Sequence, residues 1–245
     1  MRFSAWCLVL SSWCAVAGCR KPEVERVEWP VMGTIAAVQF RGGPVDGAAT
    51  EVIRDAFAAV NDEFNAFDVQ SAIRRTGKCT EFGRPCWDFA FRLKDETDGA
   101  FDPRWRGKDS LDFGAVAKGF AVDVAAEKVK ARVPSADVLI DLGGNLKTVK
   151  GDWTVGIKDG ESFVLHEGEA CATSARYYRG DHIKDARTGG EVTNAVYSIT
   201  VVHPSSAMIA DGLSTVMFIL GHEKGEAFLK KHYPEARAVW INAGL

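Results

Sequence analysis

One short segment, IADGLSTVMFILG, places a carboxylate and two hydroxyls in an otherwise apolar run. Asp211 and Thr215 are four residues apart, so a helix would place both side chains on one face. A carboxylate and a hydroxyl are hard oxygen ligands, which suit Mg²⁺ better than Zn²⁺. The simpler alternative is a helix N-cap formed by Asp211 or Ser206, which needs no metal. The segment alone leaves both interpretations open.

A second segment, LDFGAVAKGFAVD, combines Asp112 with Lys118 near the start of an Ala- and Val-rich run. The free N–H groups of a helix start, together with a nearby lysine, can bind phosphate. Asp112 can cap that helix or bind a polar edge of a cofactor. The long glycine-flanked loop of a P-loop is missing. A solvated lysine on an amphipathic helix remains the alternative.

A third segment, CATSARYYRGDHIKDARTGG, gathers Arg176, Arg179 and His182 after a strand of small residues. A histidine among basic and hydroxyl residues can carry a proton. Asp185 and the residues after it can instead serve only to build a turn. A structural or surface role for His182 therefore stays open.

Hydrophobic periodicity predicts the elements that must position these residues. Apolar residues at helical spacing predict helices over 46–67, 87–99, 114–133, 209–221 and 223–232. Strand patterns cover 34–40, 136–143, 146–150, 153–157, 162–166, 195–203 and 236–241. The short runs between 136 and 166 indicate an antiparallel meander. The order of helices and strands is typical of an α+β fold with one compact unit.

Composition narrows the classes of function. The chain has 245 residues, of which 47% are hydrophobic, which allows a sizeable core. The formal charge of −3 gives no basic balance that would draw the protein to a polyanion. We therefore expect no nucleic-acid partner.

The N-terminus has the pattern of an export signal. MRFSAWCLVLSSWCAVAGC has a basic residue, an apolar run and small residues before Cys19, and the run is too short and interrupted for a comfortable membrane span. Its VAGC ending resembles a bacterial lipobox, which implies cleavage before Cys19 and lipid on its sulfur. A plain signal peptide is the alternative. We divide the chain into a lipoprotein signal peptide (1–18), a charged tether (19–29) and one domain (30–245).

Three cysteines remain after the signal and the lipidated position. Cys79 and Cys86 bracket a short turn, and an exported protein meets an oxidising compartment, so these two could pair or stay free thiols. Cys171 would then be left over. No cysteine spacing resembles a zinc site.

Seven blocks in one order carry a resemblance to a known family. They are MGT, GAFDP, LDFGAVAKGFAVD, DLGGN, ATSARYYR, HIKDARTG and VVHPSSAMIADGLSTVMFILG. Together, from Met32 to Gly221, they resemble the bacterial ApbE-type family of FAD-dependent protein flavin transferases. The resemblance implies a single compact α+β domain of mainly antiparallel strands with flanking helices.

The resemblance also implies an activity. Members of this family cleave FAD at its pyrophosphate, transfer FMN to a Thr or Ser of an acceptor protein and release AMP, with Mg²⁺ supporting the phosphoryl transfer. The acceptors are typically subunits of membrane redox systems. Because many members are exported lipoproteins, we expect a lipid-anchored protein of the bacterial cell envelope, on the periplasmic side.

The resemblance assigns roles to individual residues. The metal-binding positions correspond to Asp211, Thr215 and the backbone carbonyl of Ala115. The FAD-contacting positions correspond to Met32, Asp112, Lys118 and a backbone clamp formed by Ala100, Phe101 and Asp102. His182 matches a histidine that could take the proton from the acceptor hydroxyl, Phe67 could replace a stacking aromatic, and Arg176 and Arg179 could steady phosphate.

The chain also departs from the family pattern, mostly on the side that would hold FAD. Ala186 stands where the family has Pro, Ala175 stands where it has Gly, and the segment after GAFDP is unusually short. The SEISRxN block survives only as SAIRRTG. These changes put cofactor affinity in doubt more than metal binding. They leave two alternatives open: an FAD pyrophosphatase that releases FMN and AMP, and a non-catalytic flavin-binding lipoprotein.

Overall fold

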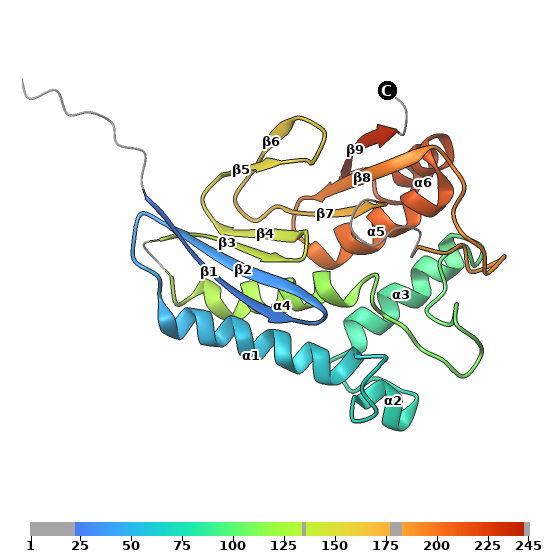
Figure 1. Cartoon of the computed structure of the whole chain (residues 1–245), viewed down its shortest axis with the longest axis horizontal. Helices are drawn as coiled ribbons and strands as arrows, with labels where there is room; N and C mark the ends of the chain where they lie inside the picture. Colours follow the sequence, from blue (N-terminus) through green and yellow to red (C-terminus); the bar gives the residue numbers. More distant parts are fainter. Residues whose placement is uncertain (1–22, 134–135, 177–182, 243–245) are drawn as a thin grey trace, which may run out of the picture.

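The structure is a computed structural model that describes residues 23–133, 136–176 and 183–242 (Figure 1). Its centre is one antiparallel sheet of seven strands in the order β1-β2-β3-β4-β7-β8-β9. These strands are β1 (Val24–Val31), β2 (Thr34–Arg41), β3 (Asp137–Leu142), β4 (Asn145–Lys150), β7 (Ala170–Ala175), β8 (Val196–His203) and β9 (Arg237–Asn242). The α+β prediction with mainly antiparallel strands is confirmed.

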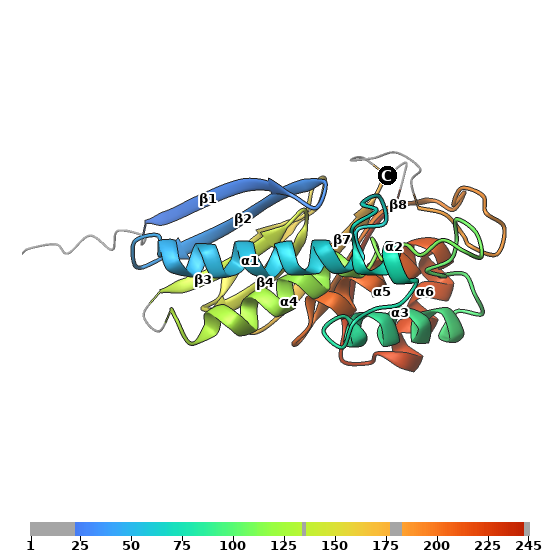
Figure 2. The same cartoon turned by 90° about the horizontal axis from the view of Figure 1, so that it is seen from below.

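Six helices flank this sheet in the described residues. They are α1 (Gly47–Phe64), α2 (Ala72–Thr76), α3 (Arg84–Glu96), α4 (Ala117–Lys130), α5 (Ala207–Leu220) and α6 (His222–His232). Figure 2 shows α1 and α4 below the β1–β4 half of the sheet, and α5 below the β7–β8 half. The main core fills this interface, because alternate strand residues point toward the helices. Those strand residues include Val38, Phe40, Ile140, Leu142, Ile199 and Val201.

The opposite face of the sheet is covered in part by a hairpin. Its strands, β5 (Trp153–Gly156) and β6 (Ser162–Leu165), pair only with each other. Trp153, Leu165 and Cys171 pack there in a second, small core. The predicted meander is therefore only half right, because β3–β4 and β5–β6 are hairpins of different sheets.

Helix α1 illustrates how local sequence sets an element. The Asp46 carboxylate accepts a hydrogen bond of 3.0 Å from the N–H of Ala49 and so caps the first turn. Ile53, Phe57 and Val60 recur at helical spacing and are fully buried against the core. Each such side chain contributes roughly 1.5–3 kcal/mol when it is removed from water.

The N-terminal boundary differs from the prediction. The tether was expected to reach residue 29, but β1 begins at Val24 and pairs with β2 over its whole length. Its register with β2 buries Trp29 in the main core, while Glu25 and Glu28 face water. The domain therefore begins at least six residues earlier than predicted. The predicted signal peptide and Cys19 lie outside the described residues.

Two further findings concern membranes and thiols. None of the described helices is long and apolar enough to cross a lipid bilayer. Cys79, Cys86 and Cys171 are all free thiols in the structure, so the possible Cys79–Cys86 pair is not formed. Burial raises the pKa of the Cys171 thiol to about 12, and the same cause raises the pKa of Cys86.

Candidate functional site

The candidate site is built on the contact between α4 and α5, which pack against each other on the helix side of the sheet (Figure 2). A Cβ at Gly119 would overlap the backbone carbonyl of Ala207, so only glycine allows the two helices to approach this closely. One turn along α4, the Asp123 carboxylate accepts hydrogen bonds from the N–H groups of Ala207 and Met208, at 2.9 and 3.0 Å. The start of α5 is thereby fixed against α4.

The buried charges of this contact are paired. Lys147 on β4 donates to Asp123 at 2.8 Å, and the Ser206 hydroxyl donates to the same carboxylate at 2.7 Å. Ser206 in turn accepts from the N–H of Ile209 and is the N-cap of α5. The capping alternative therefore applies to Ser206. Asp211 lies in the second turn of the helix, and it is left without a capping role.

Asp211 is almost completely buried, with 5% of its surface exposed. Its Oδ2 accepts a hydrogen bond of 3.0 Å from the N–H of Gly119 and lies 3.5 Å from Lys118 Nζ. Burial raises the pKa of Asp211, while Lys118 and the Gly119 N–H pull it back toward the ionised form. A buried carboxylate needs a cation beside it, and here that cation is a lysine.

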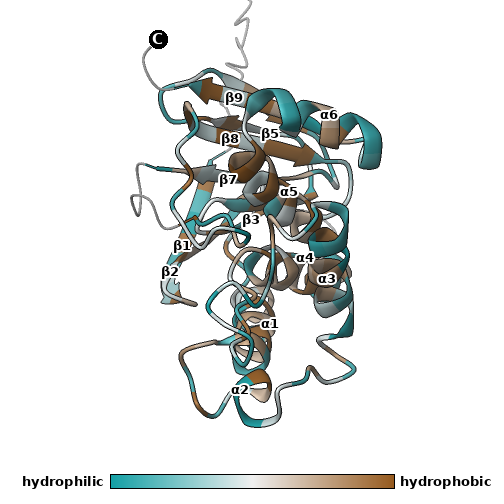
Figure 3. Ribbon diagram, turned by 90° about the vertical axis from the view of Figure 1, so that its right-hand side faces the viewer, coloured by the Kyte–Doolittle hydropathy of each residue, from teal (hydrophilic) through white to brown (hydrophobic). Residues whose placement is uncertain are grey.

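Three hydroxyl residues cluster where α5 packs on the end of β7. Ser174, near the end of β7, lies 2.9 Å from Ser214 Oγ and 3.4 Å from Thr215 Oγ1. The Ser214 hydroxyl also donates to the backbone carbonyl of Asp211 at 2.9 Å. All three hydroxyl residues are buried. The predicted pair of Asp211 and Thr215 thus shares one oxygen-rich face of α5, which Figure 3 shows to be an otherwise largely hydrophobic helix.

The oxygen ligands predicted here are of the kinds that a hard divalent cation binds. The predicted carbonyl ligand, Ala115, follows Gly114, whose own carbonyl accepts a hydrogen bond of 2.7 Å from Lys118 Nζ. Lys118 therefore links the loop before α4 to Asp211. The described residues contain no group of three or more His, Cys, Asp or Glu suited to a metal. One carboxylate with hydroxyl and carbonyl oxygens suits Mg²⁺, which usually takes few protein ligands.

The GAFDP block is a second part of the predicted site. Ala100 and Phe101 are buried, and the carbonyl of Ala100 accepts a hydrogen bond of 3.0 Å from the N–H of Ala186. This bond joins two predicted blocks, GAFDP and the loop after residue 183. The Asp102 carboxylate forms an ion pair with Lys94, with 2.7 Å between Oδ2 and Nζ, and this contact links the block to α3. The loss of Pro at Ala186 leaves an N–H that the structure uses for this contact.

Asp112 organises the short loop that follows GAFDP. Its carboxylate accepts from Trp105 Nε1 at 3.3 Å, from the N–H of Gly114 at 2.9 Å, and from Arg106 Nε at 3.0 Å. These contacts close the loop onto the start of α4. The predicted contact between Asp112 and FAD stays a prediction, since the described contacts of this carboxylate are all within the loop.

Met32 forms the turn between β1 and β2. Both Met32 and Gly33 have positive φ, of 50° and 69°, as a tight hairpin turn requires. This turn lies beside the DLGGN block, because the N–H of Gly143 donates to the carbonyl of Ile35 at 3.1 Å. Met32 packs partly buried on the main core, and its role as a wall of a flavin site stays a prediction.

The remaining predicted residues divide into two groups. His182 and Arg179 lie outside the described residues. Arg176 donates hydrogen bonds to the backbone carbonyls of Val192, Asn194 and Val196, so its described contacts hold a loop. Phe67 is 77% exposed, with Arg106 stacked over its ring at 4.9 Å, and so remains accessible to a planar ligand.

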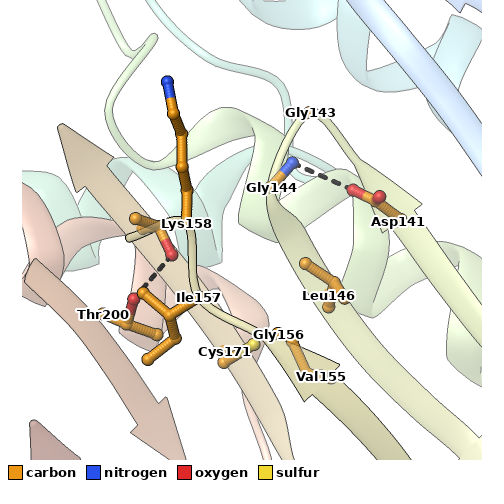
Figure 4. Close-up of a pocket in the computed structure, with 11 residues that line it drawn as sticks. Asp141, Gly143, Gly144, Leu146, Val155, Gly156, Ile157, Lys158, Cys171 and Thr200 are labelled. Atoms are coloured by element: carbon orange, nitrogen blue, oxygen red, sulfur yellow. Dashed lines mark hydrogen bonds between the residues drawn. The ribbon is translucent and has the colours of Figure 1, made fainter. Parts of the chain in front are cut away.

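A cavity of about 480 Å³ lies on the other face of the sheet, under the β5–β6 hairpin (Figure 4). Thr173 and Thr200 share a hydrogen bond of 2.8 Å in its lining, and Asp141 accepts from the N–H of Gly144. Thr173 neighbours Ser174 on the same strand, so their side chains point to opposite faces. This cavity is therefore separate from the Asp211 site.

Sequence reasoning missed two residues that build the site, Gly119 and Asp123. Gly119 carried a readable signal, because a glycine inside a helix often marks a close backbone approach. Asp123 had no such signal. Its partners Ser206, Ala207 and Met208, at the start of α5, lie more than 80 positions along the chain, and only the fold brings them together.

Comparison with solved structures defines the class of protein by its fold. Flavin transferase ApbE from Vibrio cholerae aligns with a TM-score of 0.75 at 23% identity, covering 90% of this chain and 94% of that one. The ApbE protein from Thermotoga maritima aligns with a TM-score of 0.78 at 20% identity, covering 91% and 95%. At this level of identity the likeness shows the fold, a single α+β domain shared with these proteins.

Sequence comparison then identifies the family. The model of the ApbE family matches residues 105–240, and the chain belongs to the ApbE family. A protein named FAD:protein FMN transferase from Vibrio cholerae is 26% identical over 91% of this chain and 89% of its own length. A second protein named FAD:protein FMN transferase, from Klebsiella pneumoniae, is 35% identical over a matched segment. This segment covers 49% of this chain and 42% of that relative's length.

Proposed function

We propose that this protein is a Mg²⁺-dependent FAD:protein FMN transferase. It cleaves the pyrophosphate of FAD, joins FMN through a phosphoester to a Thr or Ser of an acceptor protein, and releases AMP. Family membership and relatives with this name support the proposal. The observation that carries it is the buried Asp211 on α5, whose carboxylate accepts from the N–H of Gly119 and lies 3.5 Å from Lys118 Nζ in the first turn of α4.

The reaction exchanges one bond to phosphorus for another. The acceptor hydroxyl oxygen forms a bond to the phosphorus of the FMN half, the bond from that phosphorus to the AMP oxygen breaks, and the hydroxyl proton passes to a base. Asp211, Thr215 and the carbonyl of Ala115 would hold the Mg²⁺ ion. When bound, the ion neutralises pyrophosphate oxygens as negative charge develops on the departing AMP.

The other predicted residues would bind FAD and position its phosphates. Lys118, in the first turn of α4, would bind the phosphates through its ammonium group. Ala100, Phe101 and Asp102 supply a backbone clamp for FAD that is already fixed by its contacts to Ala186 and Lys94. Met32 and Asp112 would bind other parts of the cofactor. His182 is our choice for the base that takes the acceptor's proton.

The cellular setting forms a further part of the proposal. The VAGC ending supports cleavage before Cys19 and lipidation of its sulfur, which would tether the domain to a membrane of the bacterial cell envelope on the periplasmic side. The acceptor would then be a membrane redox subunit that presents a Thr or Ser to this compartment.

Mass spectrometry of the mature chain tests the activity. The protein is incubated with FAD and Mg²⁺, with and without an acceptor fragment carrying a flavinylatable Thr, and Asp211→Asn serves as the matched variant. The proposal predicts one FMN added to the acceptor, with AMP released, and no adduct with the variant. FMN and AMP without an adduct across a panel of acceptors would favour a pyrophosphatase. Intact, tightly bound FAD would favour a flavin-binding protein.

A further inference from the structure

We infer that Lys118 is a displaceable counter-cation of Asp211, which the divalent ion must replace, so that metal and FAD bind cooperatively. This inference rests on the proposed function, because it concerns the same metal and the same phosphates. It assigns to Lys118 a role before FAD arrives, in addition to the phosphate contact expected from the family.

The first observation is the position of the ammonium group. Lys118 Nζ lies 2.7 Å from the carbonyl oxygen of Gly114 and 3.5 Å from Asp211 Oδ2. It therefore contacts one oxygen of the predicted carboxylate ligand and a carbonyl next to the predicted ligand Ala115. Oxygens of this kind are what a hard divalent ion would bind. The ammonium group of Lys118 thus supplies the positive charge that the buried Asp211 carboxylate requires.

The second observation is the arrangement of contacts on the carboxylate. Within the described part of the chain, the hydrogen bond from Gly119 and the ion pair with Lys118 both fall on Oδ2 of Asp211. No described residue donates a hydrogen bond to Oδ1. The described residues thus leave one oxygen of the carboxylate for a second cation. A divalent ion bound there would lie close to the ammonium, and the two positive charges would repel each other at a site shielded from water.

The third observation is that Lys118 can leave. Asp211 is buried in the helix contact, whereas the Lys118 side chain is 25% exposed and stands in the first turn of its helix. A phosphate bound at this helix start would offer the ammonium a new anionic partner. FAD would thereby lower the cost of moving the lysine away from Asp211. Because such coupling is reciprocal, bound metal would also strengthen FAD binding.

Titration of the mature chain with Mn²⁺, followed by electron paramagnetic resonance, tests this role. Lys118→Met removes the ammonium and keeps a similar apolar stem. Lys128→Met, at an exposed position of the same helix, is the control for a lost charge. We expect Lys118→Met to bind Mn²⁺ several-fold more tightly than the wild type in the absence of nucleotide, and Lys128→Met to match the wild type. Equal or weaker binding in Lys118→Met would overturn the inference.

A second titration with saturating ADP measures the coupling, because ADP carries the pyrophosphate without the flavin. The signal of Mn²⁺ bound to ADP alone is measured without protein and subtracted. The wild type should gain about tenfold in Mn²⁺ affinity, within the usual range of such couplings, and Lys118→Met should gain much less. An equal gain in both proteins would overturn the coupling.

Asp211→Asn separates this inference from the proposed function. If that variant loses Mn²⁺ binding while Lys118→Met binds no more tightly than the wild type, the metal site stands and only the role of Lys118 fails. If Asp211→Asn binds Mn²⁺ as the wild type does, the proposed metal site itself is wrong. Thermal unfolding of each variant confirms that the titrated proteins are folded.

Discussion

The two halves of the site are held together in different ways. The α4–α5 contact is buried and rests on backbone-to-backbone approach at Gly119 and on an internal carboxylate, Asp123. The loops that would hold FAD rest on partly exposed ion pairs, such as Asp112 with Arg106, and on one backbone hydrogen bond from Ala186. The side proposed to bind the metal is therefore fixed by packing, while the side proposed to bind FAD is fixed by polar contacts that can rearrange.

This difference matches what each half would have to do. A metal site requires ligands held at set distances, and close-packed helices supply that rigidity. A loop that admits a large cofactor must open and close, and exposed ion pairs contribute little free energy against such movement. The departures from the family pattern in the cofactor-side loops therefore fall where the fold tolerates change.

The strongest test of this comparison is Gly119→Ala. The added methyl would overlap the carbonyl of Ala207 and push the helices apart, so we expect a loss of about 2–3 kcal/mol in the free energy of unfolding, and loss of Mn²⁺ binding. Gly47→Ala in α1 is the matched control, because its methyl meets no atom within 4 Å and should be neutral or stabilising. Denaturant unfolding measures both. Equal stability of the two variants would contradict a tight α4–α5 contact.

Asp123→Ala should have the next largest effect. It leaves Lys147 unpaired in a buried position and removes the acceptor for two N–H groups at the start of α5, so we expect a loss of about 3 kcal/mol or less. Ser206→Ala removes the cap and one of the hydrogen bonds to Asp123, and it should cost about 1–2 kcal/mol. The comparison uses the same unfolding assay. A larger effect from Ser206→Ala would show that the cap, and not Asp123, holds α5.

The response to pH should also distinguish the two halves. Burial lowers the pKa of His203, whose Nδ1 accepts from the N–H groups of Ser205 and Ser206 at the start of α5. The unfolded chain then binds more protons than the folded one, so stability should be complete above the ordinary histidine pKa of about 6.5 and should fall as pH drops through it. His203→Gln should flatten this part of the pH profile of unfolding. An unchanged profile would contradict the assignment.

The cofactor-side loops should respond only at lower pH. Arg187 holds the pKa of Asp185 below its ordinary value through hydrogen bonds to the carboxylate. A carboxyl with a lowered pKa stabilises the fold above its unfolded pKa, and that contribution is lost only as pH falls below about 4. The contribution of Asp185 should therefore remain intact across the pH range in which the His203 effect appears.

The smallest effect on stability should come from Asp112→Asn. The Asp112 side chain is 15% exposed, but asparagine keeps an oxygen that can accept from the N–H of Gly114, so we expect a change of about 1 kcal/mol in the free energy of unfolding. The same variant should weaken FAD binding, measured by flavin fluorescence, because the loop loses its contact with Arg106. Asp109→Asn, at an exposed position of the same loop, is the control and should leave both unchanged. A loss of several kcal/mol would make this loop as rigid as the helix contact.

The sequence predicted elements whose patterns are local. Helix α1, strand β8 and helix α5 were all predicted, because each has a continuous periodicity of its own. The sequence pattern of strand β1 indicates a tether, since its outward residues are charged and Pro30 interrupts it, as is usual for an edge strand. The separation of β5–β6 from the main sheet was also missed, because strand pairing depends on distant partners.

The site shows the same limit. Asp211 and Thr215 share a helix face through their spacing, and this part was predictable. The contacts of Asp211 with Gly119 and Lys118 join positions more than 90 residues apart, and no local pattern contains them. The sequence therefore suggested candidate ligands, and the fold supplied the partners that hold them.

The most direct measurement is anomalous diffraction from crystals of the mature chain grown with Mn²⁺ and FAD. One data set then locates both the ion and the cofactor in the same crystal. We expect one Mn²⁺ peak at a ligand distance of about 2.1 Å from the Asp211 carboxylate, with Thr215 beside it and Lys118 turned toward a phosphate. An ion bound away from Asp211, or FAD bound in the cavity under β5–β6, would contradict it.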